Sequence, residues 1–157
     1  MYIRNFREKT PVFTTEKTPF QVGLAQVLRS GKDATLVGHG YLVYWFLQIA
    51  EELKRKVSLE VINLHTIKPL DGKTILASAK KTKRVFCAED HNVIGGMGSA
   101  VAEFLSQNYP VPIKLHGVQD IFAESGSAKD LWKKYKLDKA GTKQILLEFL
   151  RKQGSLK

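Results

Sequence analysis

The residues whose side chains are best suited to catalysis or binding are Glu89, Asp90 and His91, which directly follow the apolar run at 85–88. This run predicts a buried strand, and α/β folds place their ligand crevices at the carboxyl ends of parallel strands. A carboxylate beside an imidazole can carry out acid–base chemistry or hold the imidazole in one tautomer. If the strand continues, Glu89 and His91 point to one side of the sheet and Asp90 to the other. A polar turn that bonds a loop or a partner subunit is the alternative, and the position leaves both interpretations open.

Three glycines, Gly95, Gly96 and Gly98, come next, at the start of a predicted helix. Backbone amides at a helix N-terminus bind anions, and glycine lets a phosphate come close. However, the spacing matches neither the GxGxxG of dinucleotide-binding folds nor the GxxxxGK[ST] of phosphate-binding loops. Close packing of helix on sheet, or contact with another chain, explains the glycines better. We predict an interface or packing loop, with an anion site as the alternative.

The sequence does not indicate a metal site or a nucleophile. The histidines His39, His65, His91 and His116 form no i, i+4 pair, and three of them lie at predicted strand ends. Cys87 is the only cysteine, so neither an intrachain disulfide nor a cysteine zinc cluster can form. Its apolar neighbours predict a buried, unreactive thiol. We therefore assign no catalytic residue and no metal ligand within this chain.

Positioning these residues requires a framework, and the hydrophobic pattern predicts one of alternating strands and helices. Residues 1–20 are polar and interrupted by prolines, as is typical of a connector. Short apolar runs at 26–29 and 34–37 flank a glycine-containing turn, which predicts an antiparallel hairpin at a sheet edge. The remaining predicted elements are a helix at 41–56, a strand at 59–64, a helix capped by Asp71 and reaching residue 80, the strand at 85–88, a helix after the glycine turn, a strand at 111–115, and helices at 128–135 and 138–152.

Strands that alternate with helices require right-handed crossovers and a largely parallel sheet covered on both faces. The predicted fold is therefore a three-layer α/β/α domain. Its sheet is mostly parallel, with about five strands and an antiparallel edge strand.

Composition limits the classes of function. The 157 residues suit one domain with a real core. No apolar run approaches the roughly 18 residues that span a bilayer, and the opening segment does not resemble a secretory signal, so we expect a cytoplasmic protein. The formal charge is +10, but each Lys/Arg cluster falls at the end of a predicted helix, where cations complement the helix dipole. Because no nucleic-acid recognition motif accompanies them, we expect solvated surfaces and no nucleic-acid or membrane partner.

Together the motifs resemble the C-terminal domain of transketolase, over nearly the whole chain and in the family's order. The opening residues resemble the segment where the family's pyrimidine-binding domain leads into the C-terminal one. The matching strings are Tyr2-Ile3-Arg4, Lys9-Thr10-Pro11, Phe20-Gln21-Val22-Gly23, Ile67-Lys68-Pro69-Leu70-Asp71, Glu89-Asp90-His91 with the glycine turn, Glu124-Ser125-Gly126-Ser127, and Leu137-Asp138-Lys139-Ala140-Gly141.

The resemblance implies a homodimeric enzyme of the pentose phosphate pathway that moves a two-carbon ketol unit between sugar phosphates. It uses thiamine diphosphate and a divalent metal, usually Mg²⁺, which in the family lie between two other domains. This sequence contains no counterpart of the Gly-Asp-Gly…Asn stretch that binds the pyrophosphate and metal. We therefore expect residues 1–20 to be a connector from a pyrimidine-binding domain and residues 21–157 to be the C-terminal domain. We expect the chain to be inactive without the remaining transketolase domains or subunit.

The resemblance carries over one functional residue, Arg4, which matches the family's arginine that contacts the substrate phosphate. A guanidinium suits a phosphate group. In this chain alone we expect Arg4 to be disordered, because the strand that should carry it has lost its neighbours. For Glu89, Asp90 and His91 the resemblance implies no catalytic role, and contact with the dimer mate is our preferred interpretation.

Two relatives share this domain: deoxyxylulose-5-phosphate synthase and the β subunit of 2-oxoacid dehydrogenase decarboxylase components. The segments at 4–11 and 124–141 favour transketolase over both. A domain of another class, which only dimerises or binds an anionic regulator, is the further alternative.

Overall fold

The computed structural model describes residues 2–154 and contains a five-stranded sheet in the order β1-β3-β2-β4-β5. The strands are β1 (Gln26–Arg29), β2 (Ala34–Gly38), β3 (Leu59–Asn63), β4 (Val85–Asn92) and β5 (Ile113–Val118). β2 to β5 run parallel, and the edge strand β1 runs antiparallel to β3. The predicted sheet is thus confirmed. Met1 and residues 155–157, which belong to the two predicted domain ranges, lie outside the described residues.

The position of β1 corrects one prediction, the hairpin between 26–29 and 34–37. β1 pairs with β3, with Gln26 opposite Asn63, while β2 lies between β3 and β4. The turn between β1 and β2 is not a hairpin turn. The amides of Lys32 and Asp33 both donate to the Ser58 carbonyl, just before β3, at 3.1 and 2.9 Å. β2 is completely buried and needs a strand on each side, whereas the partly exposed β1 suits an edge.

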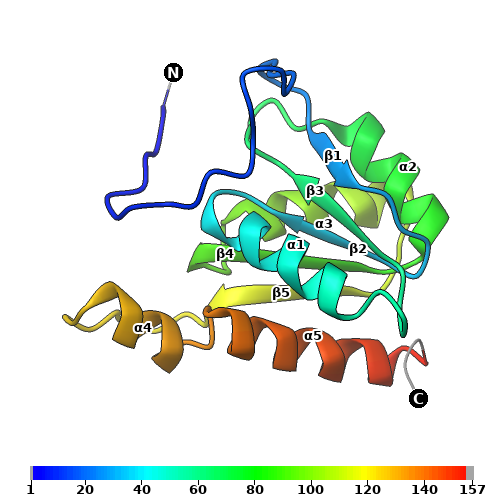
Figure 1. Cartoon of the computed structure of the whole chain (residues 1–157). Helices are drawn as coiled ribbons and strands as arrows, with labels where there is room; N and C mark the ends of the chain where they lie inside the picture. The colour runs from blue at the N-terminus through cyan, green and yellow to red at the C-terminus, as the bar shows by residue number, and fades with distance from the viewer. Residues whose placement is uncertain (1, 155–157) are drawn as a thin grey trace.

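Helices cover both faces of the sheet, as the three-layer prediction requires (Figure 1). α1 (Tyr41–Glu52) and α5 (Lys139–Lys152) pack on one face around Phe46, Phe86 and Leu146. α2 (Gly72–Thr82) and α3 (Met97–Asn108) pack on the other around Ile62 and Val101. The short α4 (Ala128–Lys134) follows β5.

Helices α2 and α5 each begin at a capping aspartate. As predicted, Asp71 caps α2: its Oδ1 accepts from the Thr74 amide at 3.0 Å. Its second oxygen accepts from the Ala25 amide at 2.8 Å, which ties the segment before β1 to α2. Asp138 caps α5 in the same way, through the Gly141 amide at 2.9 Å.

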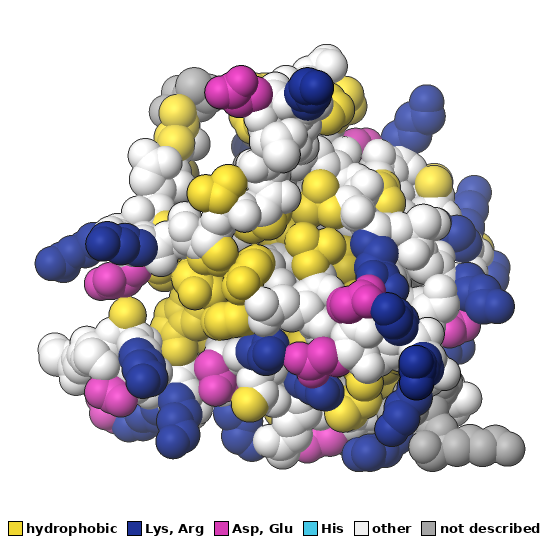
Figure 2. Space-filling view, in the orientation of Figure 1, with side chains coloured by type: hydrophobic (Ala, Val, Ile, Leu, Met, Phe, Trp, Pro, Cys, Tyr) yellow, Lys and Arg dark blue, Asp and Glu magenta, His cyan; other side chains and the backbone are white. Residues whose placement is uncertain are grey.

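Basic side chains lie where the sequence placed them, with Lys80 and Lys81 in the last turn of α2 and Lys133 and Lys134 in that of α4. Figure 2 shows Lys and Arg spread mainly around the periphery of one face of the molecule. Within residues 2–154, every helix is too short or too polar to cross a bilayer.

Candidate functional site

The carboxyl ends of the parallel strands meet at one edge of the sheet and bring the predicted site residues together. Gly38 of β2 stands level with Asn63 of β3 and with Ala88 of β4, and Ala88 stands level with His116 of β5. His39 therefore follows β2 directly beside the point where β4 reaches Glu89. Figure 1 shows this edge at the left, near the dark blue N-terminal segment.

Glu89, Asp90 and His91 occupy an irregularity in β4. Ala88 pairs with His116 and Asn92 pairs with Val118, so four steps along β4 face two steps along β5. The extra residues form a bulge, a feature that re-aims side chains at sheet edges. The strand thus continues through the motif, although only residues 85–88 were predicted to belong to it.

Glu89 points toward α3 and is only 2% exposed. Its two carboxylate oxygens accept hydrogen bonds from the Met97 and Gly98 amides, at 2.7 and 2.9 Å. These amides begin α3, where a negative charge also complements the helix dipole. A carboxylate of the protein itself therefore occupies the position that an anion would take, which favours packing over the anion-site alternative for this loop.

The glycines of the loop allow this approach. A Cβ on Gly96 would come within 2.6 Å of the Glu89 Cδ and Oε1 atoms, and one on Gly98 would lie 2.9 Å from Leu115 Cδ2. Gly95 instead adopts a left-handed conformation with φ of 72°, open to the space around it. The sequence reasoning missed Gly117, where a Cβ would lie 2.6 Å from the His91 carbonyl oxygen. The bulge of β4 fits against β5 only because Gly117 has no side chain.

Asp90 points to the opposite side, as strand alternation predicted, and forms an ion pair with Arg4. The distance from Arg4 Nη2 to Asp90 Oδ1 is 2.5 Å, and the two side chains are 38% and 15% exposed. The expectation that Arg4 is disordered in this chain is therefore wrong. The N-terminal connector lies against the sheet edge, where Arg4 contacts the Asp90 carboxylate, 86 positions away in the sequence.

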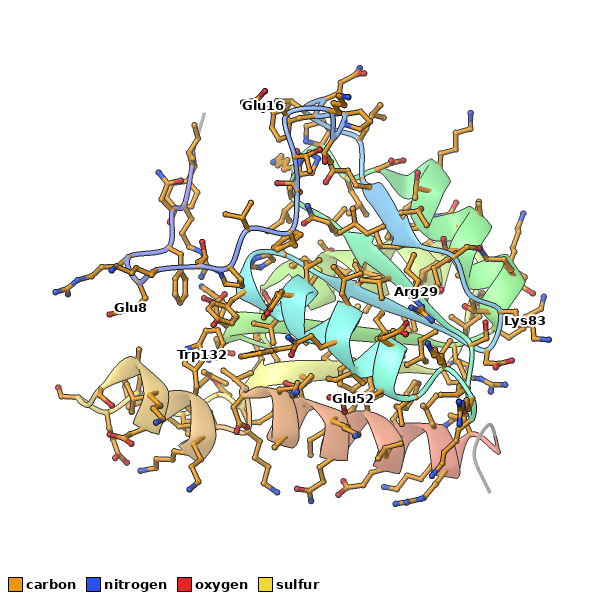
Figure 3. The ribbon with its side chains drawn as sticks, in the orientation of Figure 1. Glu8, Glu16, Arg29, Glu52, Lys83 and Trp132 are labelled. Atoms are coloured by element: carbon orange, nitrogen blue, oxygen red, sulfur yellow. The ribbon has the colours of Figure 1, made fainter. Side chains whose placement is uncertain are left out.

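Two residues further on, Phe6 fastens the same segment to an aromatic cluster. Its ring lies 5.8 Å from that of Trp132 of α4 and 6.1 Å from that of Tyr41 of α1, while Tyr41 and Trp132 meet edge to face at 4.7 Å. Figure 3 labels Trp132 between α4 and the start of α1. Aromatic pairs of this kind contribute about 1 kcal/mol each beyond their burial.

The histidines stand in different surroundings. Burial lowers the pKa of His39, and the neighbouring Asp90 carboxylate opposes that shift. Burial also lowers the pKa of His116, whose Nε2 lies 2.9 Å from the Lys136 carbonyl oxygen and donates to it. His65 stacks on Phe20 at 4.6 Å, and His91 is exposed. Within residues 2–154, no three His, Cys, Asp or Glu side chains gather as metal ligands would.

Two features lie away from this edge. Cys87 is buried, as predicted, and burial raises the pKa of its thiol.

A groove of about 600 Å³ lies between β1 and α2, bordered by Leu24, Val27 and Lys81. Its buried carboxylates are already engaged, since Glu60 pairs with Lys81 and Asp71 accepts the two amides described above. The groove therefore offers no uncommitted carboxylate, and the carboxyl edge remains the better candidate.

Comparison with known proteins identifies similar chains. The model of the family "Transketolase, C-terminal domain" matches residues 23–141. A 6-deoxy-6-sulfo-D-fructose transketolase subunit of Clostridium sp. (strain MSTE9) is 43% identical over 138 residues, which are 87% of this chain and 43% of the relative. A 1-deoxy-D-xylulose-5-phosphate synthase of Desulfotalea psychrophila is 39% identical over 85% of this chain and 21% of its own length. This chain thus spans less than half of these curated relatives.

Among solved structures, a split-gene transketolase described as an inactive β4 tetramer superposes with a TM-score of 0.86. The two sequences are 36% identical, and the match covers 92% of this chain and 48% of the other. The fold agrees over nearly all of the present chain.

Proposed function

This chain belongs to the family of transketolase C-terminal domains, and we propose that it forms the C-terminal part of an enzyme that moves a two-carbon ketol unit between sugar phosphates. One observation carries the proposal: similarity to a split transketolase extends over 92% of this chain but over only 48% of the other. The remaining parts of the catalyst are then supplied by further domains, in the same chain or in a partner. Residues 1–20 connect to the pyrimidine-binding domain, and residues 21–157 form the C-terminal domain.

In this proposal the domain contributes to assembly and is inactive alone. The inactive state described for the β4 tetramer of the split-gene relative supports it. The hydrogen bonds from the Met97 and Gly98 amides to the Glu89 carboxylate also support it, because they use the glycine loop to pack α3 against β4. The complete enzyme is a homodimer, and the exposed apolar side chains of Ile94 and Phe122 at the carboxyl edge suit a contact with another domain.

The cofactor of the complete enzyme is thiamine diphosphate with Mg²⁺, and it supplies the carbanion stabilisation that ketol transfer needs. The glycine turn at the start of α3 does not fit its pyrophosphate. A pyrophosphate needs unengaged backbone amides or cations around a helix start, and Glu89 already takes the Met97 and Gly98 amides. We therefore propose that cofactor and metal bind outside this domain, while Arg4 reaches the substrate phosphate.

The proposed substrates are phosphorylated sugars of the cytoplasm, within the pentose phosphate pathway. Nucleic acid is not among the proposed partners, because the basic residues cap helix ends instead of lining one groove.

The test uses the complete enzyme, reconstituted from this chain and the remaining domains of its own transketolase, with thiamine diphosphate and Mg²⁺. Ketol transfer from xylulose 5-phosphate to ribose 5-phosphate is the expected result. Condensation of pyruvate with glyceraldehyde 3-phosphate and release of CO₂ would instead assign the chain to deoxyxylulose-5-phosphate synthase, the second candidate that sequence identity favours. Activity of this chain alone would refute the assembly role.

A further inference from the structure

We propose that the groove between β1 and α2 binds an extended segment of an acidic partner protein, which adds a strand to the free edge of β1. The segment carries one apolar side chain between two acidic ones, all three on the same face. The inference does not depend on the proposed function, which places the contact with other domains at the carboxyl edge.

β1 is the outermost strand of the sheet and pairs on one side, with β3. Among residues 2–154, the preceding segment 18–21 is bonded to β1 through the Gln26 side chain, which donates to the Pro19 carbonyl. A hollow of about 390 Å³ separates that segment from β1. Figure 1 shows β1 in blue at this edge, beside α2. The backbone groups on the outer side of β1 are therefore open to a strand from another chain.

The floor of the groove is apolar and exposed. Leu24 and Val27 are 48% and 49% exposed, and Ala77 of α2 borders the same groove. Val27 pairs with Ile62 of β3, which is buried on the face covered by α2 and α3. Because paired residues lie on the same face of a sheet, Val27 also faces α2. An apolar side chain of a bound strand would cover this floor and remove it from water.

The charged side chains that a partner meets at the groove are lysines. Lys73 and Lys81 border it and are exposed, and α2 itself contains no acidic residue. Two carboxylates also border the groove, but both are buried and engaged. Glu60 accepts hydrogen bonds from Lys81 and Thr35, and Asp71 caps α2. The rim is therefore positive toward solvent, which complements acidic side chains.

The spacing of the two lysines defines the segment that fits. Lys73 and Lys81 are eight positions apart on α2, which is about 12 Å along a helix. In an extended chain four residues span about 13 Å, and alternate side chains point to the same face. Acidic residues at positions i and i+4 therefore reach both lysines, while the residue at i+2 lies over Val27 and Ala77.

A second copy of this chain is a poorer occupant. Each copy carries a formal charge of +10. Pairing of two β1 edges would bring the Lys73 and Lys81 side chains of both copies to one interface. Like charges that face each other across strands are destabilising. The occupant we propose is therefore a partner of opposite charge.

The experiment measures binding of a fluorescein-labelled peptide, Thr-Thr-Glu-Thr-Val-Thr-Glu-Thr-Thr, to this chain by fluorescence anisotropy. We expect saturable binding with a Kd of about 0.1 mM, in the weak range of small interfaces. Moving the second Glu one position earlier turns it to the other face and should weaken binding about fivefold, the value of one exposed ion pair. Replacing Val by Ser should weaken binding about fivefold, because the floor is no longer covered.

Variants of the chain locate the site. Ala77→Glu places a carboxylate in the groove and should weaken binding about tenfold, and Lys73→Gln removes one rim charge and should weaken it about fivefold. Lys80→Gln is the matched control, because it removes the same charge from the same helix where Lys80 lies 6.0 Å from the centroid of the Tyr109 ring. It should leave the Kd within about twofold at physiological salt. Circular dichroism melts confirm that each variant is folded.

Four results would overturn the proposal. The first is no binding of the peptide. The second is equal binding of the peptide whose acidic residues face opposite sides, or equal competition by inorganic polyphosphate at the same charge concentration, since either shows attraction to positive charge alone. The third is unchanged binding to both Ala77→Glu and Lys73→Gln, which places the peptide elsewhere. The fourth is a dimer of this chain that Val27→Lys abolishes, which assigns the groove to a second copy.

Discussion

The glycine turn offers a sharp test of how the carboxyl edge is built, because two neighbouring glycines are required for different reasons. Gly96 has an ordinary backbone (φ −86°, ψ −167°), but its Cβ would fall on the Glu89 carboxylate. Gly95 has a positive φ of 72° and open space around its Cβ position. Gly96→Ala therefore produces a clash without backbone strain, and Gly95→Ala produces strain without a clash.

The magnitudes follow from the contacts. To admit a methyl group at residue 96, Glu89 must withdraw and weaken two charge-assisted hydrogen bonds, each worth about 1.5–3 kcal/mol. We expect Gly96→Ala to lower the free energy of unfolding by about 3 kcal/mol, after partial relaxation. Gly95→Ala should cost about 1 kcal/mol, the usual penalty for a left-handed alanine.

The assay is urea unfolding of this chain followed by circular dichroism. With a slope of about 2 kcal/mol per molar urea, the midpoint should fall by about 1.5 M for Gly96→Ala and 0.5 M for Gly95→Ala. The decisive comparison repeats both substitutions in Glu89→Ala. There Gly96→Ala should cost less than about 0.5 kcal/mol, because nothing remains to clash with, while the cost of Gly95→Ala should not change. Additive costs for Gly96→Ala and Glu89→Ala would refute the reasoning.

Three further outcomes are expected. At constant ionic strength, phosphate should raise the melting temperature of Glu89→Ala above its value in chloride, because the variant frees the Met97 and Gly98 amides. The unmodified chain should melt at the same temperature in both salts. A higher melting temperature of the unmodified chain in phosphate would support the anion-site interpretation of the loop. The free energy of unfolding should fall as the pH drops below about 6.5, since burial lowers the pKa of His39, His65 and His116 and the unfolded chain binds protons that the folded chain resists. His116→Gln should make this slope shallower without abolishing it, and an unchanged slope would exclude His116. Titration calorimetry of this chain with thiamine diphosphate and Mg²⁺ should give no micromolar binding, and a micromolar Kd would contradict our placement of the cofactor outside the domain.

Local pattern was sufficient for the elements and for their layers. The β-branched run at 59–64, the apolar run at 85–88 and the helical faces after residues 41 and 138 were found as predicted, with ends moved by a few residues. Capping by Asp71 was also predictable, because a cap acts within three residues of its own position. Such signals are short-range, and a single sequence displays them directly.

Pairing was not predictable in the same way. The runs at 26–29 and 34–37 have the spacing of a hairpin, but β1 pairs with β3, which lies between β1 and the buried β2. Which strand lies beside which depends on how the whole sheet buries its central strands, and that is a property of the assembled core. The bulge in β4 and the need for a glycine at position 117 opposite it could not be predicted for the same reason.

For the site, the sequence by itself determined the position of Glu89, Asp90 and His91 at a strand's carboxyl end and the opposite directions of Glu89 and Asp90. Only the tertiary structure decided what each residue does. Glu89 meets amides eight and nine residues ahead once α3 has packed on the sheet, and Asp90 meets Arg4 from 86 residues away. The Glu89 and Asp90 side chains point to opposite sides because alternation along a strand is a local property. Their hydrogen-bond partners depend on packing between elements that come together only when the chain folds.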